Sequence, residues 1–436
     1  MFFLNGALLG VWVPHIPEMQ LRLALGEGAL GVALLMVPLG SVGSMPLGAW
    51  IIRTFGSRRS TLIGFFTFAG GLALALLAPV YIALAGALAL FGLGNGLMDI
   101  GMNAQGVDVE RARPRPIMSM LHGMYSIGNF AGAMASGALL TVGLQPQVNG
   151  VATGAAALLV GMPFAARLLK KGESAGDGES DEWRSSSGES AGDGGSRHAD
   201  AAQPDRQRAA PGHADSGAPG SGEDPHADEQ DTDNAAPGHA EDLHTNSGAP
   251  AIVVRHIVGF LAVLCAVAFF NLMGESAMND WSTVYMRSVL DTPAAVAAAA
   301  YGAFAFAMAV GRFSGDRIIA ATSRRFVLAC GLVLAALGVA TAMLAGGAAP
   351  AIGGFALAGL GLANGIPILF GAAGRLRGLR EGSAMAMVMG TAYAGGIVGP
   401  PTIGFIAEAV GLQWTLLGLA AVLFLAAVAS TATPLR

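Results

Sequence analysis

Two asparagine–acid–asparagine triplets stand in apolar stretches far apart in the chain, and their residue types suit proton transfer or the binding of a polar solute. They are Asn95, Asp99 and Asn103 in the first stretch, and Asn271, Glu275 and Asn279 in the second. Because the members of each triplet are four residues apart, an α-helix would stack them on one face. Acidic side chains inside membrane helices are costly and normally face a bundle interior or a water-filled cavity. We therefore expect both faces to line one central cavity.

Asp99 and Glu275 are the acids from which we expect chemistry. A carboxyl group in an apolar wall can bind and release a proton as the cavity opens to one side and then to the other. Counted along each helix at about 1.5 Å per residue, Asp99 falls on the cytoplasmic side of the membrane centre and Glu275 on the outer side. We therefore expect these acids to flank the centre without pairing directly. The structural alternative for each is a hydrogen bond to a neighbouring helix.

Three further residues are candidates for the cavity. His122 is expected at a similar depth to Asp99, and its helical face continues to Tyr125. A neutral histidine could relay a proton or bind a hydroxylated solute, and it could equally be a packing residue. Asn364 is a candidate because the GLGLANG string around it echoes the GLGNG string around Asn95.

Aromatic side chains could stack on a sugar-like ring or anchor the protein at the lipid interface, as Trp and Tyr often do. Trp12, Trp281, Tyr125 and Tyr393 are the candidates. Trp281 lies near the outer end of its segment and is therefore expected to be an interface anchor. Its neighbour Asp280 is expected to be interfacial as well.

Two charged groups suggest structural or gating roles. Arg312 lies inside an apolar segment and requires a partner, for which Asp316, one helical turn further on, is the expected residue. A second group follows the fourth apolar segment and suggests an inner-gate or loop charge network, not a substrate site. Its members are Glu110, Arg111, Arg113 and Arg115.

The composition is that of a membrane protein. Of the 436 residues, 53% are hydrophobic and 12% are charged, whereas soluble domains carry about 25% charged residues. Residues 172–250 hold 18 of the 29 acidic residues and only four arginines. That stretch cannot bury enough apolar surface to fold, so we expect a disordered, acidic, cytoplasmic linker. It separates two membrane domains, at residues 1–171 and 251–436.

Six apolar segments precede the linker and six follow it, most of them with the roughly 20 residues needed to cross a bilayer. Lysine and arginine gather after every second segment, with 17 on one side and two, Arg22 and Arg287, on the other. Since basic loops remain in the cytoplasm, both termini and the linker are expected to be cytoplasmic. The apolar start, without a leading tail, suggests that the natural chain begins further upstream.

These features resemble the major facilitator superfamily, over both membrane domains but not the linker. In the loop Ala49–Arg59, Gly56, Arg58 and Arg59 fit the family's loop motif, while Arg53 stands where the family has an acid. The family's charge latch at this loop is therefore not expected in its usual form. Five strings further resemble the bacterial rhizopine-transporter-like (MosC-like) permeases. They are MNAQGVDVER (Met102–Arg111), MSMLHGMYSIGNFAG (Met118–Gly132), GESAMNDW (Gly274–Trp281), GRFSG (Gly311–Gly315) and IVGPP (Ile397–Pro401).

We expect an all-α membrane protein with twelve transmembrane helices in two pseudo-symmetric six-helix halves, the major facilitator fold. The sequence contains no nucleotide-binding loop, triad spacing or metal-ligand cluster, and both cysteines, Cys265 and Cys330, lie in apolar runs. We therefore expect no enzyme activity, cofactor, metal site or nucleic-acid partner. The interpretation we favour is a monomeric, proton-coupled secondary transporter of the bacterial cytoplasmic (inner) membrane. It would move a small hydroxylated solute (a sugar, polyol or amino-polyol) by alternating access.

Two other functions fit the same residues. An acid pair would suit a proton-driven efflux antiporter for cationic or hydrophobic compounds. A non-transporting membrane sensor could signal through the linker instead. Deleting the linker should leave transport intact if the protein is a transporter, and should abolish signalling if it is a sensor.

Overall fold

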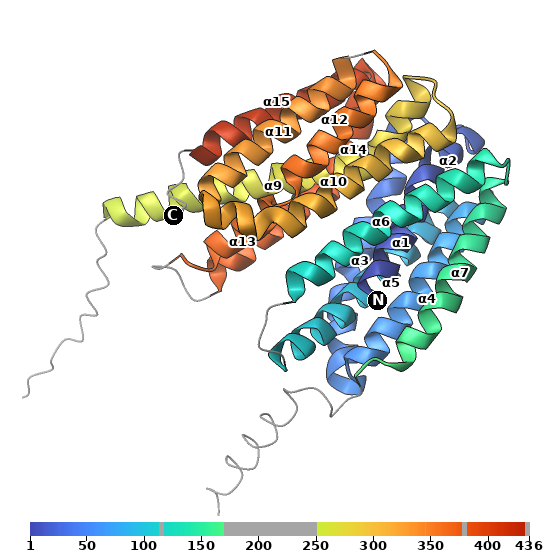
Figure 1. Cartoon of the computed structure of the whole chain (residues 1–436), viewed down its shortest axis with the longest axis horizontal. Helices are drawn as coiled ribbons and strands as arrows, with labels where there is room; N and C mark the ends of the chain where they lie inside the picture. The colour runs from blue at the N-terminus through green and yellow to red at the C-terminus, as the bar shows by residue number, and fades with distance from the viewer. Residues whose placement is uncertain (113–116, 170–250, 345, 377–381, 432–436) are drawn as a thin grey trace, which may run out of the picture. The chain divides into compact units, whose positions relative to one another are not determined.

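The computed structural model describes residues 1–112, 117–169, 251–344, 346–376 and 382–431, and every regular element in these ranges is helical. The predicted linker at 172–250 lies outside the described residues, as do Arg113 and Arg115. The first group of helices, blue to green in Figure 1, consists of α1 (Phe2–Trp12), η1 (Val13–His15), α2 (Ile16–Arg22), α3 (Glu27–Phe55), α4 (Ser57–Leu77), α5 (Tyr81–Arg111), α6 (Met118–Thr141) and α7 (Pro146–Ala166). The second group, yellow to red, consists of α9 (Ala251–Ser288), α10 (Ala294–Ala321), α11 (Arg324–Leu344), α12 (Ala348–Leu362), α13 (Gly365–Ala373), α14 (Ser383–Val410) and α15 (Leu412–Thr431).

These helices make twelve membrane-crossing units, as the sequence predicts. Nine stretches in the described part of the chain are long and apolar enough to cross a bilayer, with α12 and α13 counted together. The other three units are α6, α14 and the succession α1, η1 and α2. Six units therefore precede the predicted linker and six follow it.

The helix contacts repeat between the two groups. In the first group, α1 packs on α6, α3 on α5, α4 on α5 and α4 on α7. In the second group the corresponding helices pair in the same way, α9 with α14, α10 with α12, α11 with α12 and α11 with α15. Between the groups, α6 packs on α10 and α3 packs on α14. The fifth helix of each half thus packs on the second helix of the other, which is the pseudo-symmetry expected of two six-helix halves.

Glycines allow the closest of these helix crossings. On α1, a Cβ atom at Gly6 or Gly10 would clash with the backbone of α6, at Tyr125 and Asn129 respectively. In return, a Cβ atom at Gly128 of α6 would clash with the backbone carbonyl of Phe3. Membrane helices have no hydrophobic force that drives them together within lipid, so close backbone approach at small residues supplies the packing energy.

Gly56 separates α3 from α4 and is one of the predicted loop-motif residues. Its φ of 87° lies in a region that residues with a Cβ atom adopt only with strain. The chain can therefore end α3 at Phe55 and begin α4 at Ser57 with a single residue between them. Arg53 in the last turn of α3 has the charge that the helix dipole favours at that end.

Polar contacts and close packing join the two halves where α2 and α9 end and α3 begins. The Thr283 hydroxyl donates to the backbone carbonyl of Val13 (3.0 Å), and the Arg287 guanidinium lies 3.0 Å from the Glu18 carboxylate. Close by in the chain, a Cβ atom at Gly31 would lie 2.6 Å from the carbonyl oxygen of Pro400. These contacts hold the two halves together at one end of the helix bundle.

Candidate functional site

A cavity of about 300 Å³ lies between the two halves. Helices α1, α3, α5 and α6 line it from the first half, and α9 and α14 from the second. Its polar lining residues are Ser41, Asn95, Asp99, Tyr125, Ser276, Asn279, Asp280 and Tyr393. The remaining walls are mainly aliphatic. Such a site, apolar with a few converging polar groups, is typical of small-molecule binding.

On the first half, α5 supplies the polar wall, to which Asn95 and Asp99 of the predicted triplet contribute. Asn95 accepts a hydrogen bond from the Asn5 amide (3.1 Å) and donates one to the Ser41 hydroxyl (3.4 Å). One turn further along, Asp99 accepts a hydrogen bond from the Asn103 amide at 3.0 Å. Asn103 does not line the cavity. Its position four residues after Asp99 places its amide one helical turn further along α5, where it donates the hydrogen bond to the Asp99 carboxylate.

On the second half, α9 places Asn279 and Asp280 in the cavity wall. Asp280 accepts a hydrogen bond from the hydroxyl of Ser276 (3.0 Å), which is one turn earlier on the same helix. The expectation that Asp280 is interfacial is wrong, because α9 continues for two further turns to Ser288. The serine–aspartate spacing of four residues was a usable signal that sequence analysis missed.

Glu275 does not line the cavity but forms an ion pair with Arg312 of α10 at 3.1 Å. Both side chains are largely buried, with 17% and 18% of their surface exposed respectively. The expected partner of Arg312 was Asp316, and that prediction is wrong. Asp316 is exposed, whereas the long arginine side chain reaches across to the neighbouring helix and so compensates a buried carboxylate.

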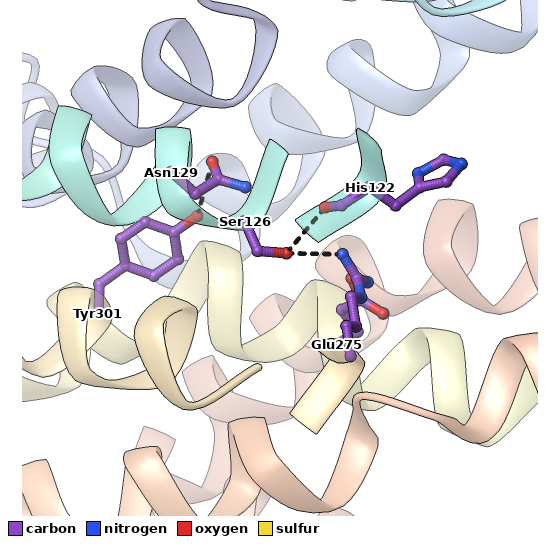
Figure 2. Close-up of polar contacts among 6 residues, drawn as sticks. His122, Ser126, Asn129, Glu275 and Tyr301 are labelled. Atoms are coloured by element: carbon purple, nitrogen blue, oxygen red, sulfur yellow. Dashed lines mark hydrogen bonds and ion pairs between the residues drawn. The ribbon is translucent and has the colours of Figure 1, made fainter. Parts of the chain in front are cut away.

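Arg312 also reaches the first half of the protein, where it donates a hydrogen bond to the Ser126 hydroxyl of α6 (2.9 Å). Figure 2 shows this contact together with a second one between the same two helices, in which the Tyr301 hydroxyl donates to the Asn129 side chain at 3.3 Å. Ser126 in turn donates to the backbone carbonyl of His122 (3.4 Å). The ion pair of one half is therefore tied directly to the other half.

The sequence profile of the Major Facilitator Superfamily matches residues 1–352 and 264–435. The chain belongs to this superfamily. It is 30% identical over 429 residues to an uncharacterized MFS-type transporter of Yersinia pestis, which covers 98% of this chain and 92% of that protein. It is also 30% identical over 430 residues to membrane protein MosC of Rhizobium meliloti, covering 98% and 87% of the two chains. The predicted resemblance to MosC-like members of the superfamily is confirmed.

A solved superfamily structure shares the fold. The crystal structure of a D-xylose-proton symporter superimposes with a TM-score of 0.67 over 100% of this chain and 97% of that one, at 14% sequence identity. This likeness concerns architecture alone. Together with the family match it makes the chain a multi-pass membrane transporter.

Three candidates from the sequence lie away from the transporter's cavity lining. The His122 ring packs edge-on against Phe2 (centroids 5.5 Å apart), and in Figure 2 it points away from Ser126. Asn364 donates to the backbone carbonyl of Gly311 (3.0 Å), so it joins the start of α13 to α10. Asn271 is fully buried beside Gly365, and neither side-chain amide atom has a hydrogen-bond partner among the described residues.

Tryptophan burial corrects another expectation for this transporter. Trp281 has no exposed surface, and Trp12 is 3% exposed. A fully buried ring cannot anchor the protein at the lipid interface, so the expected role of Trp281 as an anchor is wrong. Of the predicted aromatic candidates, Tyr125 and Tyr393 are those that line the cavity.

The arginines of the predicted loop motif at Ala49–Arg59 differ in their surroundings. The Arg59 guanidinium lies 5.2 Å from the centre of the Phe55 ring, which suits a cation–π contact. Arg53 is exposed and Arg58 is partly buried.

Glu110 accepts backbone N–H hydrogen bonds from Ile117 (2.7 Å) and Met118 (2.9 Å) and thereby caps the start of α6. Arg111 is exposed. The expected charge network around Glu110 is thus, within the described residues, a helix cap.

Proposed function

We propose that this transporter moves a small hydroxylated solute (a sugar, polyol or amino-polyol) through the cavity between its halves. The observation that carries the proposal is the cavity lining itself, in which neutral hydrogen-bonding groups come from both halves. Asn95 and Ser41 stand on one side, and Asn279 and Ser276 on the other. Amide and hydroxyl groups both donate and accept, as the hydroxyl groups of a polyol require. The chain also shares its fold with a D-xylose-proton symporter, whose name states that it carries a sugar, and this fold is compatible with the proposed role.

Proton coupling is part of the proposal and rests on Asp99. Its carboxylate lines the cavity and receives one hydrogen bond from a neutral amide. As the halves rock, the cavity opens to each side in turn, so the same carboxyl group can take up a proton from one side and release it to the other. Glu275 would contribute indirectly, because its charge state decides whether Arg312 is neutralised.

The proposed setting is the bacterial cytoplasmic membrane, with a monomeric transporter whose termini and linker, residues 172–250, face the cytoplasm. In this orientation the contacts of Val13 with Thr283 and of Glu18 with Arg287 close the outer side. Alternating access then requires those contacts to break in each cycle. Efflux of cationic compounds is the second candidate, favoured by the two acids of the cavity wall.

Cross-linking the outer contact should stop transport. We expect cysteines at Val13 and Thr283, joined by a short thiol cross-linker, to hold the outer side closed and to abolish solute movement. Transport should return when the chemical cross-link is cleaved. The native thiols Cys265 and Cys330 would first be replaced by serine. The same double-cysteine protein without cross-linker is the control and should remain active. Full transport by the cross-linked protein would contradict the closed outer side.

The function is tested with purified full-length protein in liposomes on a solid-supported membrane. Hexoses, inositols and amino sugars are added in turn, and the current that each evokes is recorded. We expect a current with at least one of these solutes, and its loss in Asp99→Asn. Asp291→Asn, an exposed acid in the turn after α9, is the matched control and should keep the current. Currents with cationic drugs alone would favour the efflux candidate, and persistence of the polyol current in Asp99→Asn would rule out Asp99 as the coupling acid.

The sensor interpretation is tested by deleting residues 172–250. We expect transport in liposomes to survive the deletion, since every residue proposed to contact the solute lies in the membrane domains. The measurement is the same solute-evoked current. A folded deletion protein with no current would return weight to a signalling role for the linker.

A further inference from the structure

A histidine lies at the outer seal, by which we mean the contacts of Val13 with Thr283 and of Glu18 with Arg287. His15 is in η1, between α1 and α2, and its side chain has no exposed surface. Neither ring nitrogen has a hydrogen-bond partner among the described residues. We propose that His15 binds a proton from the outer side and that its protonation opens the outer seal. The inference rests on the proposed orientation and alternating access, and it adds a regulation of that cycle.

The first membrane-crossing unit is broken at the point where His15 enters the seal. Pro17, two residues further on, has no N–H to donate to the carbonyl of Val13, as the residue at that position of a regular helix would. The Val13 carbonyl therefore keeps a lone pair for the Thr283 hydroxyl of the other half, at 3.0 Å. The turn at η1 packs on α9 and on α10. His15 thus belongs to the segment through which the first half contacts the second.

The closed seal suits only the neutral form of the His15 ring. A neutral imidazole has one donor and one acceptor nitrogen, whereas the imidazolium has two donors and a positive charge. A buried charge without a counter-charge is far more costly than a buried neutral group. Since neither ring nitrogen finds a partner among the described residues, protonation in the closed seal would create such a charge. Once the seal opens and water enters, the same charge is hydrated.

The charges at this end of the bundle add to the preference for neutral His15. The elements packed on η1 are α1, α2, α6, α9 and α10. Arg22 of α2 acts on the His15 ring electrostatically, and two backbone carbonyls at the end of α4 hold its guanidinium at 2.8 and 2.6 Å. Glu18 of α2 and Arg287 of α9 are paired with each other. A proton on His15 would therefore add a second positive charge beside Arg22.

The other ionisable groups of these helices are already engaged or lie further away. No ionisable side chain lies on α1, and those of α6, His122 and Tyr125, lie in its first half. On α9 and α10, Asp280, Tyr285 and Tyr301 each have a hydrogen-bond partner on another residue. The remaining ionisable residues of α9 and α10 lie nearer the other end of the bundle. Within the described residues, none of them supplies His15 with a counter-charge.

Proton binding and opening are therefore linked. A ligand that binds one state better shifts the population toward that state. Histidine in water takes up a proton at about pH 6.5, so below about this pH the open seal gains a proton that the closed seal does not take up. With one proton bound on opening, the ratio of open to closed protein should rise by up to about tenfold for each pH unit. An acidic outer side would thus open the transporter where protons for Asp99 are available.

The test measures opening of the outer side directly, without a solute. Spin labels are attached at Val142 and Leu344, which are exposed residues at the ends of α6 and α11 on the proposed outer side. The full-length protein in nanodiscs is used, with its two native cysteines, Cys265 and Cys330, replaced by serine. Distances between the labels are measured by double electron–electron resonance between pH 5.5 and 8. We expect the population with the longer distance to grow as the pH falls.

Variants then assign this pH dependence to His15. His15→Gln keeps a polar side chain but cannot titrate in this range, so its distance distribution should not depend on pH. His15→Phe fills the volume of the ring without polar atoms and should remain closed on the outer side at every pH. It also keeps the inference testable if His15→Gln does not fold. His122→Gln is the matched control, a histidine outside the seal, and should respond to pH as the wild type does.

A wild-type pH dependence in both His15 variants would overturn the inference. If Asp99→Asn or Glu18→Gln abolished the pH dependence instead, the proton would act in the cavity or on the ion pair, and the proposed function would stand. A distance distribution that does not change with pH, in wild-type protein that transports, would overturn the inference alone. No outer opening in any condition, together with no solute-evoked current, would overturn the proposed alternating access as well.

Discussion

Replacing Arg312 with alanine is expected to abolish transport and to lower the free energy of unfolding by about 3–5 kcal/mol, the usual cost of removing one partner of a buried ion pair. The reason is Glu275, whose carboxylate would lose its cationic partner in a site where 17% of its side chain is exposed. The Ser126 hydroxyl would lose its charged donor as well. The measurement is denaturant unfolding in mixed micelles, combined with transport in liposomes.

The double variant Glu275→Gln with Arg312→Met is the control for this prediction. It removes both charges at similar side-chain volume, so most of the lost stability should return. Transport should stay low if Glu275 takes part in coupling. A stable and active Arg312→Ala single variant would show that the ion pair has neither role.

Introducing leucine at Gly128 is expected to prevent assembly of the first half. A Cβ atom there would clash with the backbone carbonyl of Phe3 on α1, and a backbone atom cannot move aside as the end of a side chain can. Overpacking in a tight core costs about 1–3 kcal/mol or more, and the fixed backbone places this site at the upper end. The variant should therefore express poorly. Any folded protein that remains should be lost from the size-exclusion peak at a markedly lower temperature than the wild type.

Gly86→Leu on α5 is the matched comparison for Gly128→Leu. No atom of the residues that the structure describes lies within 4 Å of a Cβ atom at Gly86, and leucine favours a helix by up to about 1 kcal/mol over glycine. This variant should be as stable as the wild type or slightly more stable. Equal losses in both variants would mean that leucine harms insertion in general and that the crossing of α1 with α6 is not the cause.

The fold was predictable because a bilayer leaves the backbone few choices. Chain segments within lipid must satisfy their hydrogen bonds internally, so apolar length and the distribution of arginines are enough to define twelve helices and their grouping. The similar strings at Gly92–Gly96 and Gly359–Gly365 also indicated the repeat between the halves. What these patterns do not contain is the rotation of each helix about its axis.

That rotation decides which residues reach the cavity. A step of four residues turns a helix by about 40° beyond a full turn, so a triplet spread over eight residues turns by about 80°. On α9 this places Asn279 in the cavity, Glu275 against Arg312 and Asn271 against Gly365. The three look equivalent in sequence and have three different surroundings in the structure.

Contacts between helices were the other unpredictable part. The sequence offered Asp316 as the nearest acid to Arg312, but the partner is 37 residues away at Glu275. Asp280 was misassigned because its depth depends on where α9 ends, and helix ends are the least reliable part of an assignment from sequence. Asn95 and Asp99 do line the cavity, and Asn95 also reaches Asn5 of α1 and Ser41 of α3 through hydrogen bonds that the sequence does not reveal.

The glycine crossings bear on how this architecture can persist while sequences diverge. Where backbone meets backbone, as at Gly6 and Gly128, the requirement is only that a side chain be missing. Such a rule constrains a few positions strongly and leaves the surrounding apolar residues interchangeable, since one aliphatic side chain replaces another at little cost in lipid. A chain built this way can exchange most of its residues without altering how its helices cross. This is consistent with a common fold at 14% identity between the transporter and the D-xylose-proton symporter.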